Sequence, residues 1–214
     1  MKMKESFNDT FKGLKVNASK AKRYGVYPVI LDRMYSQMIN LQSYHSRITV
    51  VRIDLHFPAS HTHDHKCENT IISRYIKTCK ADLGSKDWSK HKRVIHGWVK
   101  EIGNSGKPHY HLFFGFQTLH RNLGLISGDG HTGMWELFER RWKELTGGSV
   151  QLIRPHFLER DHGQEFADCF YHLSYLAKIR DKHFGTGETH RRFGFSKLTP
   201  KQMPPTVLEE LMAA

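Results

Sequence analysis

The stretch RVIHGWVKEIGNSGKPHYHLFFGFQT, residues 93–118, decides the fold. Two runs rich in apolar and β-branched or aromatic residues, 93–102 and 109–118, flank the short segment GNSGKP. Glycine, asparagine, serine and proline are the residues that turns prefer. Two strand-like runs separated by so short a turn predict an antiparallel β-hairpin.

Two histidines lie on the second strand of this hairpin. His109 and His111 are two residues apart, so both imidazoles project from the same face. If Ile102 pairs with Pro108, then Glu101 lies opposite His109 and points to the same side. Two imidazoles and a carboxylate suit Mg²⁺ or Mn²⁺ held near a phosphate. The simpler alternative is two ordinary strand histidines, since the chain contains 16 His and one H-x-H arises easily by chance.

Hydrophobic periodicity around the hairpin predicts an α+β fold. Apolar residues alternate in ITVVRIDLHF, 48–57, which predicts a strand, and a further strand is expected over 149–157. The predicted order of helix, strand, helix, hairpin, helix, strand, helix gives a central, mostly antiparallel sheet flanked by helices. Helical spacing is found at 28–44, 67–83, 133–145 and 165–182, with a short closing helix at 205–213.

Length and charge limit the organisation and the partners. A chain of 214 residues fits one domain with extensions. We expect a basic N-terminal arm and helix over 1–45, a central domain over 46–183 and a basic C-terminal extension over 184–214. The formal net charge of +12 suggests a polyanionic partner, usually nucleic acid. A membrane surface is the alternative, but it requires a helix with a clean basic face, and we find none.

The number of cysteines and the N-terminal residues indicate the cellular compartment. The odd set of Cys67, Cys79 and Cys169 argues against a disulfide framework. The N-terminal residues lack the apolar core of a signal peptide, and no stretch approaches the length of a membrane span. We therefore expect a cytoplasmic protein with reduced thiols.

Two tyrosines and a lysine are aligned in the helix predicted at 165–182. Tyr171 and Tyr175 are one turn apart, about 6 Å of rise, roughly opposite the apolar stripe, and Lys178 follows one turn later. A phenol with a pKa near 10 needs cationic surroundings to act as a nucleophile at neutral pH. The alternative is that these tyrosines simply pack, as most helical tyrosines do.

The two motifs, taken in order, resemble those of the HUH endonucleases. H-x-H within a strand (PHYHLFF) precedes Y-x-x-x-Y-x-x-K on a later helix (YHLSYLAK), as in rolling-circle replication initiators of the two-tyrosine type. In plasmid relaxases the tyrosine comes first. The segments VVRIDLHF and RRFGFSK are similar to the filamentous-phage (inovirus) replication proteins and their YagK/YfjJ-type prophage relatives. The resemblance covers roughly residues 45–200.

This resemblance implies a mechanism. A metal ion, Mg²⁺ or Mn²⁺, polarises a phosphate of single-stranded DNA at a replication origin. A tyrosine then attacks and leaves a 5′-phosphotyrosine, and a second tyrosine later rejoins the strands. Host helicase and polymerase would complete replication in the bacterial cytoplasm. The implied metal ligands are Glu101, His109 and His111, and the implied catalytic residues are Tyr171, Tyr175 and Lys178. We expect Tyr175 to make the first cut, because Lys178 is its nearest helical cation.

Other residues carry alternatives that the sequence leaves open. Asp54 is a possible ligand, a residue of the outer coordination sphere, or a member of a salt bridge. The run from His61 through His63 and His65 to Cys67 has residue types that bind zinc, but its spacing matches no closed structural site, and we favour a solvated loop over 58–66. The basic tail contacts DNA or packs on the sheet. The expected DNA contacts are Arg52, Arg191, Arg192, Phe193 and Lys197.

Rival functions share the same motifs. A transposase or relaxase would use the same chemistry on another element, although the motif order argues against a relaxase. A catalytically inactive DNA-binding prophage regulator would keep the charge without the reaction. A general RNA-binding protein is the third class, and no RNP-like aromatic pattern or G-x-x-G loop supports it.

Overall fold

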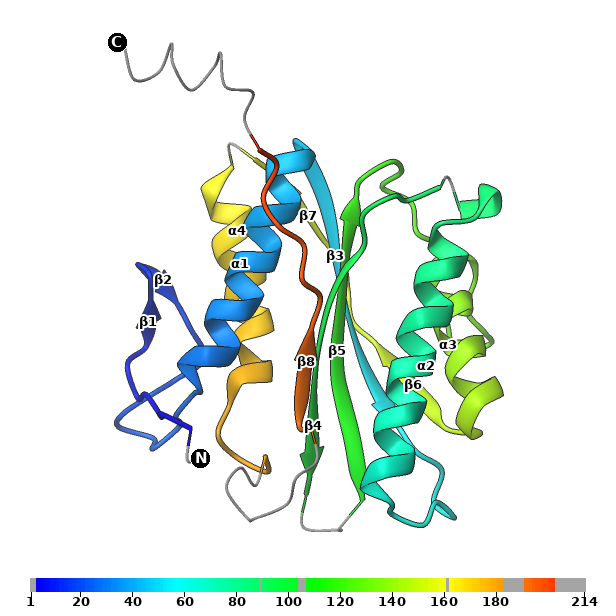
Figure 1. Cartoon of the computed structure of the whole chain (residues 1–214), viewed down its shortest axis with the longest axis horizontal. Helices are drawn as coiled ribbons and strands as arrows, with labels where there is room; N and C mark the ends of the chain where they lie inside the picture. The colour runs from blue at the N-terminus through cyan, green and yellow to red at the C-terminus, as the bar shows by residue number, and fades with distance from the viewer. Residues whose placement is uncertain (1–2, 89, 104–106, 161, 183–190, 203–214) are drawn as a thin grey trace.

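The computed structural model consists of helices packed on both faces of a sheet. Helices α1 (Pro28–Tyr44) and α4 (Gly163–Leu173) cover one face, and α2 (His65–Leu83) and α3 (Gly133–Thr146) cover the other (Figure 1). The α+β class predicted from the sequence is therefore confirmed. The structure describes residues 3–88, 90–103, 107–160, 162–182 and 191–202.

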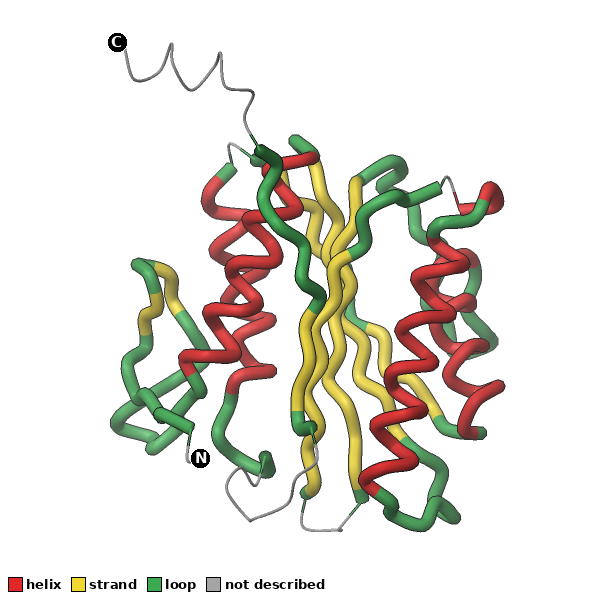
Figure 2. The backbone as a smooth tube through the Cα atoms, viewed as in Figure 1, coloured by secondary structure: helices red, strands yellow, loops and turns green. Residues whose placement is uncertain are grey.

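The sheet has six strands, and all of its described pairings are antiparallel (Figure 2). Its order is β6-β3-β5-β4-β8, and β7 also pairs with β3. A separate two-stranded hairpin lies near the N-terminus. The bounds are β1 Thr10–Phe11, β2 Leu14–Lys15, β3 Arg47–His56, β4 Ile95–Ile102, β5 Pro108–Gln117, β6 Ser149–Leu152, β7 His156–Glu159 and β8 Phe193–Phe195.

The register of the β4–β5 hairpin is the one expected from the sequence. Ile102 pairs with Pro108, and Glu101 pairs with His109. The two central strands are buried on both faces, and the face that packs on α1 and α4 changes character along its length. On β3 it begins with the buried Ile48 and Val50 and continues with polar residues from Arg52 onward. This polar end of the face holds the candidate site.

The strand expected at 149–157 is interrupted. β6 ends at Leu152 and β7 begins at His156, and the two pair with different halves of β3. Pro155 lies between them and has no N–H to donate to a ladder. The pattern of apolar residues alone did not reveal this break.

Helix α4 ends earlier than expected. Regular helix stops at Leu173, a 3₁₀ turn (η2) spans Ser174–Ala177, and Lys178 has an extended ψ of 142°. The N-terminal segment explains the change, because Tyr27 N–H donates to the Ala177 carbonyl at 2.8 Å. The helix predicted over 165–182 is therefore wrong beyond Leu173.

Helix α2 begins earlier than expected, at His65 rather than residue 67. The Asp64 carboxylate caps it by accepting hydrogen bonds from the backbone N–H groups of Lys66 and Cys67. The closing helix expected at 205–213 lies outside the described residues. In the described part of the chain, no helix is both long and apolar enough to span a bilayer.

A glycine on β4 sets how closely the edge strand approaches. A Cβ built on Gly97 would lie 2.4 Å from Phe113 Cε1 and 2.5 Å from Phe195 Cε1. We expect Gly97→Ala to lower the free energy of unfolding by about 1–3 kcal/mol, because two aromatic rings must shift. Gly103→Ala is the matched control, since a Cβ there meets nothing within 4 Å. Thermal unfolding measures both, and equal melting temperatures would contradict this close packing.

Candidate metal centre

Three potential ligands meet at the polar end of the sheet. Glu101 on β4 and His109 and His111 on β5 form a cluster of the kind that could hold a metal ion. His111 Nε2 lies 3.1 Å from Glu101 Oε2, and His109 Nε2 lies 3.3 Å from the same oxygen. Glu101 and His111 are buried, whereas the side chain of His109 is 25% exposed and gives access from solvent.

The spacing of these atoms fits one cation. Two ligands bonded at about 2.1 Å lie roughly 3.0 Å apart at a right angle and about 3.4 Å apart at a tetrahedral angle. The distances of 3.1 and 3.3 Å fall within that range. Imidazole nitrogen and carboxylate oxygen are a donor set that divalent cations accept. All three ligand atoms lie within 4.8 Å of one another, so the residues present could hold a metal ion.

Outer groups hold two of these side chains in place. Asp54 Oδ1 lies 2.8 Å from His111 Nδ1, which directs His111 Nε2 toward Glu101. Arg52 binds the Asp54 carboxylate with two hydrogen bonds of 3.1 and 2.9 Å. The fully buried ammonium of Lys182 pairs with Oε1 of Glu101, the oxygen that does not face the imidazoles. Asp54 thus makes both the outer contact and the salt bridge that the sequence left as alternatives.

The electrostatics keep the carboxylate charged. Burial by itself raises the pKa of Glu101, but hydrogen bonds from His109 and His111 and the charge of Lys182 hold it far below its usual range. Burial lowers the pKa of His111, yet its hydrogen bonds with Asp54 and Glu101 raise it overall. The cluster therefore offers an anionic ligand at neutral pH.

A tyrosine from η2 packs against the cluster. The Tyr175 ring lies edge-on to His111, with 5.1 Å between ring centroids. Two cations face the same phenol ring: the guanidinium carbon of Arg52 is 4.5 Å from its centroid, and Lys178 Nζ is 3.8 Å away. Burial raises the pKa of the Tyr175 phenol, and the charge of Glu101 raises it further.

Tyr171 has different neighbours. Its ring lies beside His172, and Lys15 Nζ is 5.7 Å from its centroid. The two tyrosines are not stacked one α-helical turn apart, because the regular helix ends at Leu173. The structure therefore brings Tyr175 and Lys178 to the candidate site of Glu101, His109 and His111, and the described contacts of Tyr171 lie elsewhere.

The residues expected to contact DNA are spread over different surroundings. Arg191 and Lys197 are exposed, whereas Arg192 is buried. Phe193 packs against the core formed with α1 and α4, and the Arg33 guanidinium lies 5.5 Å from its ring. Phe193 in this tail therefore packs on the core, which was one of the two expected alternatives. Arg52 forms an ion pair with Asp54.

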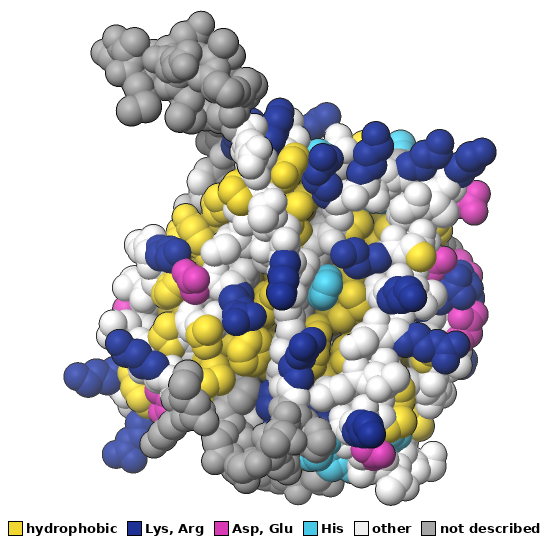
Figure 3. All heavy atoms as spheres, viewed as in Figure 1, with side chains coloured by type: hydrophobic (Ala, Val, Ile, Leu, Met, Phe, Trp, Pro, Cys, Tyr) yellow, Lys and Arg dark blue, Asp and Glu magenta, His cyan; other side chains and the backbone are white. Residues whose placement is uncertain are grey.

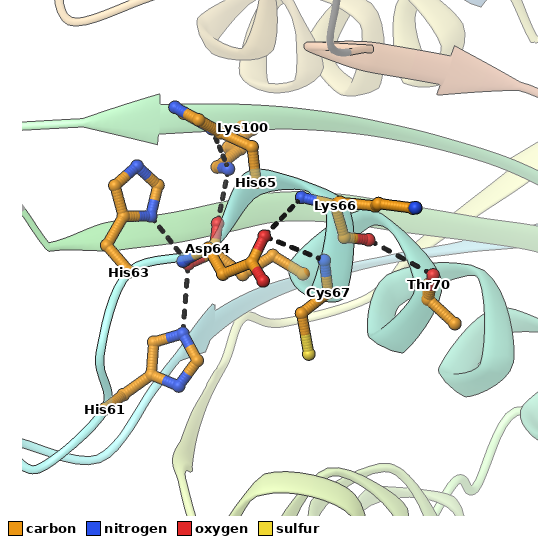
Figure 4. Close-up of polar contacts among 9 residues, drawn as sticks. His61, His63, Asp64, His65, Lys66, Cys67, Thr70 and Lys100 are labelled. Atoms are coloured by element: carbon orange, nitrogen blue, oxygen red, sulfur yellow. Dashed lines mark hydrogen bonds and ion pairs between the residues drawn. The ribbon is translucent and has the colours of Figure 1, made fainter.

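A second cluster lies on the opposite face of the hairpin (Figure 4). His61 Nε2 and His63 Nδ1 lie 2.9 and 2.6 Å from Oε1 of Glu68, which is completely buried. The segment expected to be a solvated loop is a largely exposed loop as far as Asp64, and two of its histidines, His61 and His63, contact this carboxylate. Cys67 is exposed, and its sulfur points away from the imidazoles.

A lysine already supplies a cation to this second cluster. Lys100 Nζ pairs with Oε2 of Glu68 and lies 2.8 Å from His65 Nδ1. His63, His65 and Glu68 are close enough to hold a metal ion, but the ammonium lies between two of them. At 2.6 Å, His63 and Glu68 are also closer than two ligands of one ion. We therefore take Glu101, His109 and His111 as the candidate centre.

Sequence reasoning missed the partners Glu68, Lys100 and Lys182. A signal for Lys100 was available, because a charge between the apolar neighbours of a central strand requires a buried partner. No local pattern identified Glu68 or Lys182, which come from α2 and from the segment after η2.

Comparison with known proteins places the chain in a family. The profile of the YagK/YfjJ C-terminal domain matches residues 7–196. The chain belongs to this family. It is similar to the uncharacterized proteins YfjJ and YagK of Escherichia coli (strain K12), with 26% and 29% identity. The alignments cover 78% of this chain and 92% of YfjJ, and 74% of this chain and 87% of YagK. No solved structure matches the chain.

The geometry of this YagK/YfjJ-family protein predicts one site for a divalent cation within the described residues, and Mn²⁺ serves as the probe. We expect His111→Ala to weaken Mn²⁺ binding at least about tenfold in calorimetry, because a buried ligand is lost. His63→Ala is the matched control in the second cluster and should leave the affinity unchanged. Loss of binding in His63→Ala with normal binding in His111→Ala would place the ion at Glu68 instead.

Proposed function

We propose that this YagK/YfjJ-family protein is a metal-dependent enzyme that nicks and joins single-stranded DNA through Tyr175. The observation that carries the proposal is the position of the Tyr175 ring, which lies 5.1 Å from that of His111 and faces two cations. A phenol, a cluster suited to Mg²⁺ or Mn²⁺ and two positive side chains are the groups that phosphoryl transfer to a tyrosine requires.

The chain's own residues would orient the phosphate. Arg52 and Lys178 flank the Tyr175 ring. Because Arg52 is held by the Asp54 carboxylate, Lys178 is the cation that would meet a phosphodiester beside the phenol. When bound, the divalent cation would supply Lewis-acid polarisation of the phosphate and would offset the negative charge of Glu101. That offset matters because the charge of Glu101 raises the pKa of the attacking phenol.

The proposed reaction exchanges one phosphate ester bond for another. Tyr175 Oη forms a bond to phosphorus, the bond from phosphorus to the 3′ oxygen breaks, and the phenol proton is released to solvent. The departing oxygen takes a proton and becomes a 3′-hydroxyl, while the phosphate stays on the tyrosine as a 5′-phosphotyrosine. Attack by a 3′-hydroxyl on this ester reverses the step, so joining needs no ATP.

The proposed role of Tyr171 and the proposed biological setting are supported by the sequence pattern. A role for Tyr171 in the second transfer is supported by its spacing from Tyr175 and not by its described contacts, which favour Tyr175 as the first nucleophile. The setting we propose is rolling-circle replication of a phage, prophage or plasmid element, with host helicase and polymerase. A transposase would use the same groups.

The second candidate function is DNA binding without cleavage or joining of the strand. The specific observation in its favour is that the buried Lys182 already neutralises Glu101 and that the Tyr175 phenol has a raised pKa. The same cleavage assay distinguishes the two candidates.

We expect Tyr175→Phe to abolish the covalent protein–DNA adduct, with a loss of at least about a hundredfold, because the nucleophilic oxygen is removed. Tyr171→Phe is the matched control and should retain the adduct. The assay uses labelled single-stranded DNA with Mn²⁺ and a denaturing gel. Cleavage by the Tyr171→Phe/Tyr175→Phe double variant would mean that water is the nucleophile, and no cleavage by the wild type would favour the inactive candidate.

A further inference from the structure

A groove runs between helix α2 and the edge strand β8. It consists of two adjoining hollows of about 390 and 330 Å³, which share Lys80 as a lining residue. We call this surface the α2–β8 groove. Its walls carry six cationic side chains: Lys77, Lys80, Lys92, Arg93, Arg191 and Lys197.

The charge of this groove is not balanced locally. Neither hollow is lined by an aspartate or glutamate, and within the described residues none of the six cations forms an ion pair with a carboxylate. The cations of α3 behave differently, since Arg140 pairs with Glu144 and Arg141 pairs with Asp82. Figure 3 shows lysine and arginine side chains along the strip over α2 and β8 with few acidic ones among them.

The groove is separate from the candidate metal centre. His96 and Trp98 line it, and they alternate along β4 with Val99 and Glu101, whose side chains point to the other face. The metal ligands lie on the face covered by α1 and α4, whereas the groove opens beside α2. A ligand in the groove therefore makes contacts that the metal centre does not provide.

At the floor of the groove, the edge strand β8 packs closely on β4. A Cβ built on Gly194 would lie 2.6 Å from Trp98 Nε1, so glycine at this position lets the backbone of β8 lie against the indole. Beside it, His96 Nδ1 has no hydrogen-bond partner in the described part of the chain. The groove thus combines unbalanced positive charge with a closely packed floor, beside which the buried His96 Nδ1 is left without a partner among the described residues.

We propose that the α2–β8 groove binds the sugar–phosphate backbone of single-stranded DNA as a second contact, apart from the metal centre. The choice of DNA rests on the proposed function. Single strands lie in positively charged channels, whereas duplex readers insert a protruding element into a groove about 12 Å wide. The cations here line a hollow between a helix and a strand, which fits the first mode.

The test compares two variants that each remove two positive charges. Lys77→Gln/Lys80→Gln alters the groove, and Arg140→Gln/Lys143→Gln on α3 is the matched control. Fluorescence anisotropy in EDTA measures binding to labelled oligo-dT of about 30 and about 8 nucleotides. We expect the groove variant to bind the long oligonucleotide at least about tenfold more weakly. Its slope of log affinity against log salt should fall by about 1.4, the value for two lost phosphate contacts.

Several results would overturn the proposal. Equal affinities for the groove variant and the α3 control would mean that the groove carries no DNA. A larger loss for duplex DNA or for anionic phosphatidylserine vesicles than for the single strand would assign the groove to that partner instead. The anisotropy measurement is made in EDTA and therefore does not depend on a metal. Weaker binding by the groove variant, together with no adduct formed by the wild type, would support the groove and reject the proposed nuclease. An adduct formed by the wild type, together with unchanged affinity of the groove variant, would support the proposed nuclease and reject the groove.

Discussion

The pairing of Glu101 with His109 across the β4–β5 hairpin is the constraint on which the candidate site depends. Side chains of a strand alternate between faces, so a slip of one residue would carry Glu101 to the side of α2 and bring Lys100 into its place. The register therefore decides whether the imidazoles of β5 face a carboxylate or an ammonium. The short turn between the strands fixes that register, and the apolar faces on either side reinforce it.

The same alternation gives the sheet a buried carboxylate–lysine pair on each side. Glu101 pairs with Lys182 on one face, and Lys100 pairs with Glu68 on the other. Buried ion pairs gain little net stability, because desolvation offsets the attraction, but removing one partner leaves an unpaired buried charge. The two pairs thus favour these segments beside β4, since among the described residues the segment after η2 and helix α2 bring the matching charges to Glu101 and Lys100.

Sequence patterns predicted what is local and failed where distant segments intervene. The hairpin, its register and the meeting of Glu101, His109 and His111 follow from alternation and turn residues within the single stretch 93–118. The end of α4 at Leu173 does not, because backbone groups of the N-terminal segment bind the chain there. Spacing along one ideal helix consequently predicted that both Tyr171 and Tyr175 could reach the site, whereas in the structure the ring of Tyr175 lies beside His111.

The contact between the N-terminal segment and η2 has a consequence for biosynthesis. Asn17 N–H donates to the Ser174 hydroxyl, which is 157 residues away in sequence, and Tyr27 N–H donates to the Ala177 carbonyl. The ribosome makes the first of these partners long before the second, so the turn that carries Tyr175 cannot take its final shape until most of the chain has been translated. A nascent polypeptide would already contain His109 and His111 but would lack the ordered turn that places Tyr175 beside them.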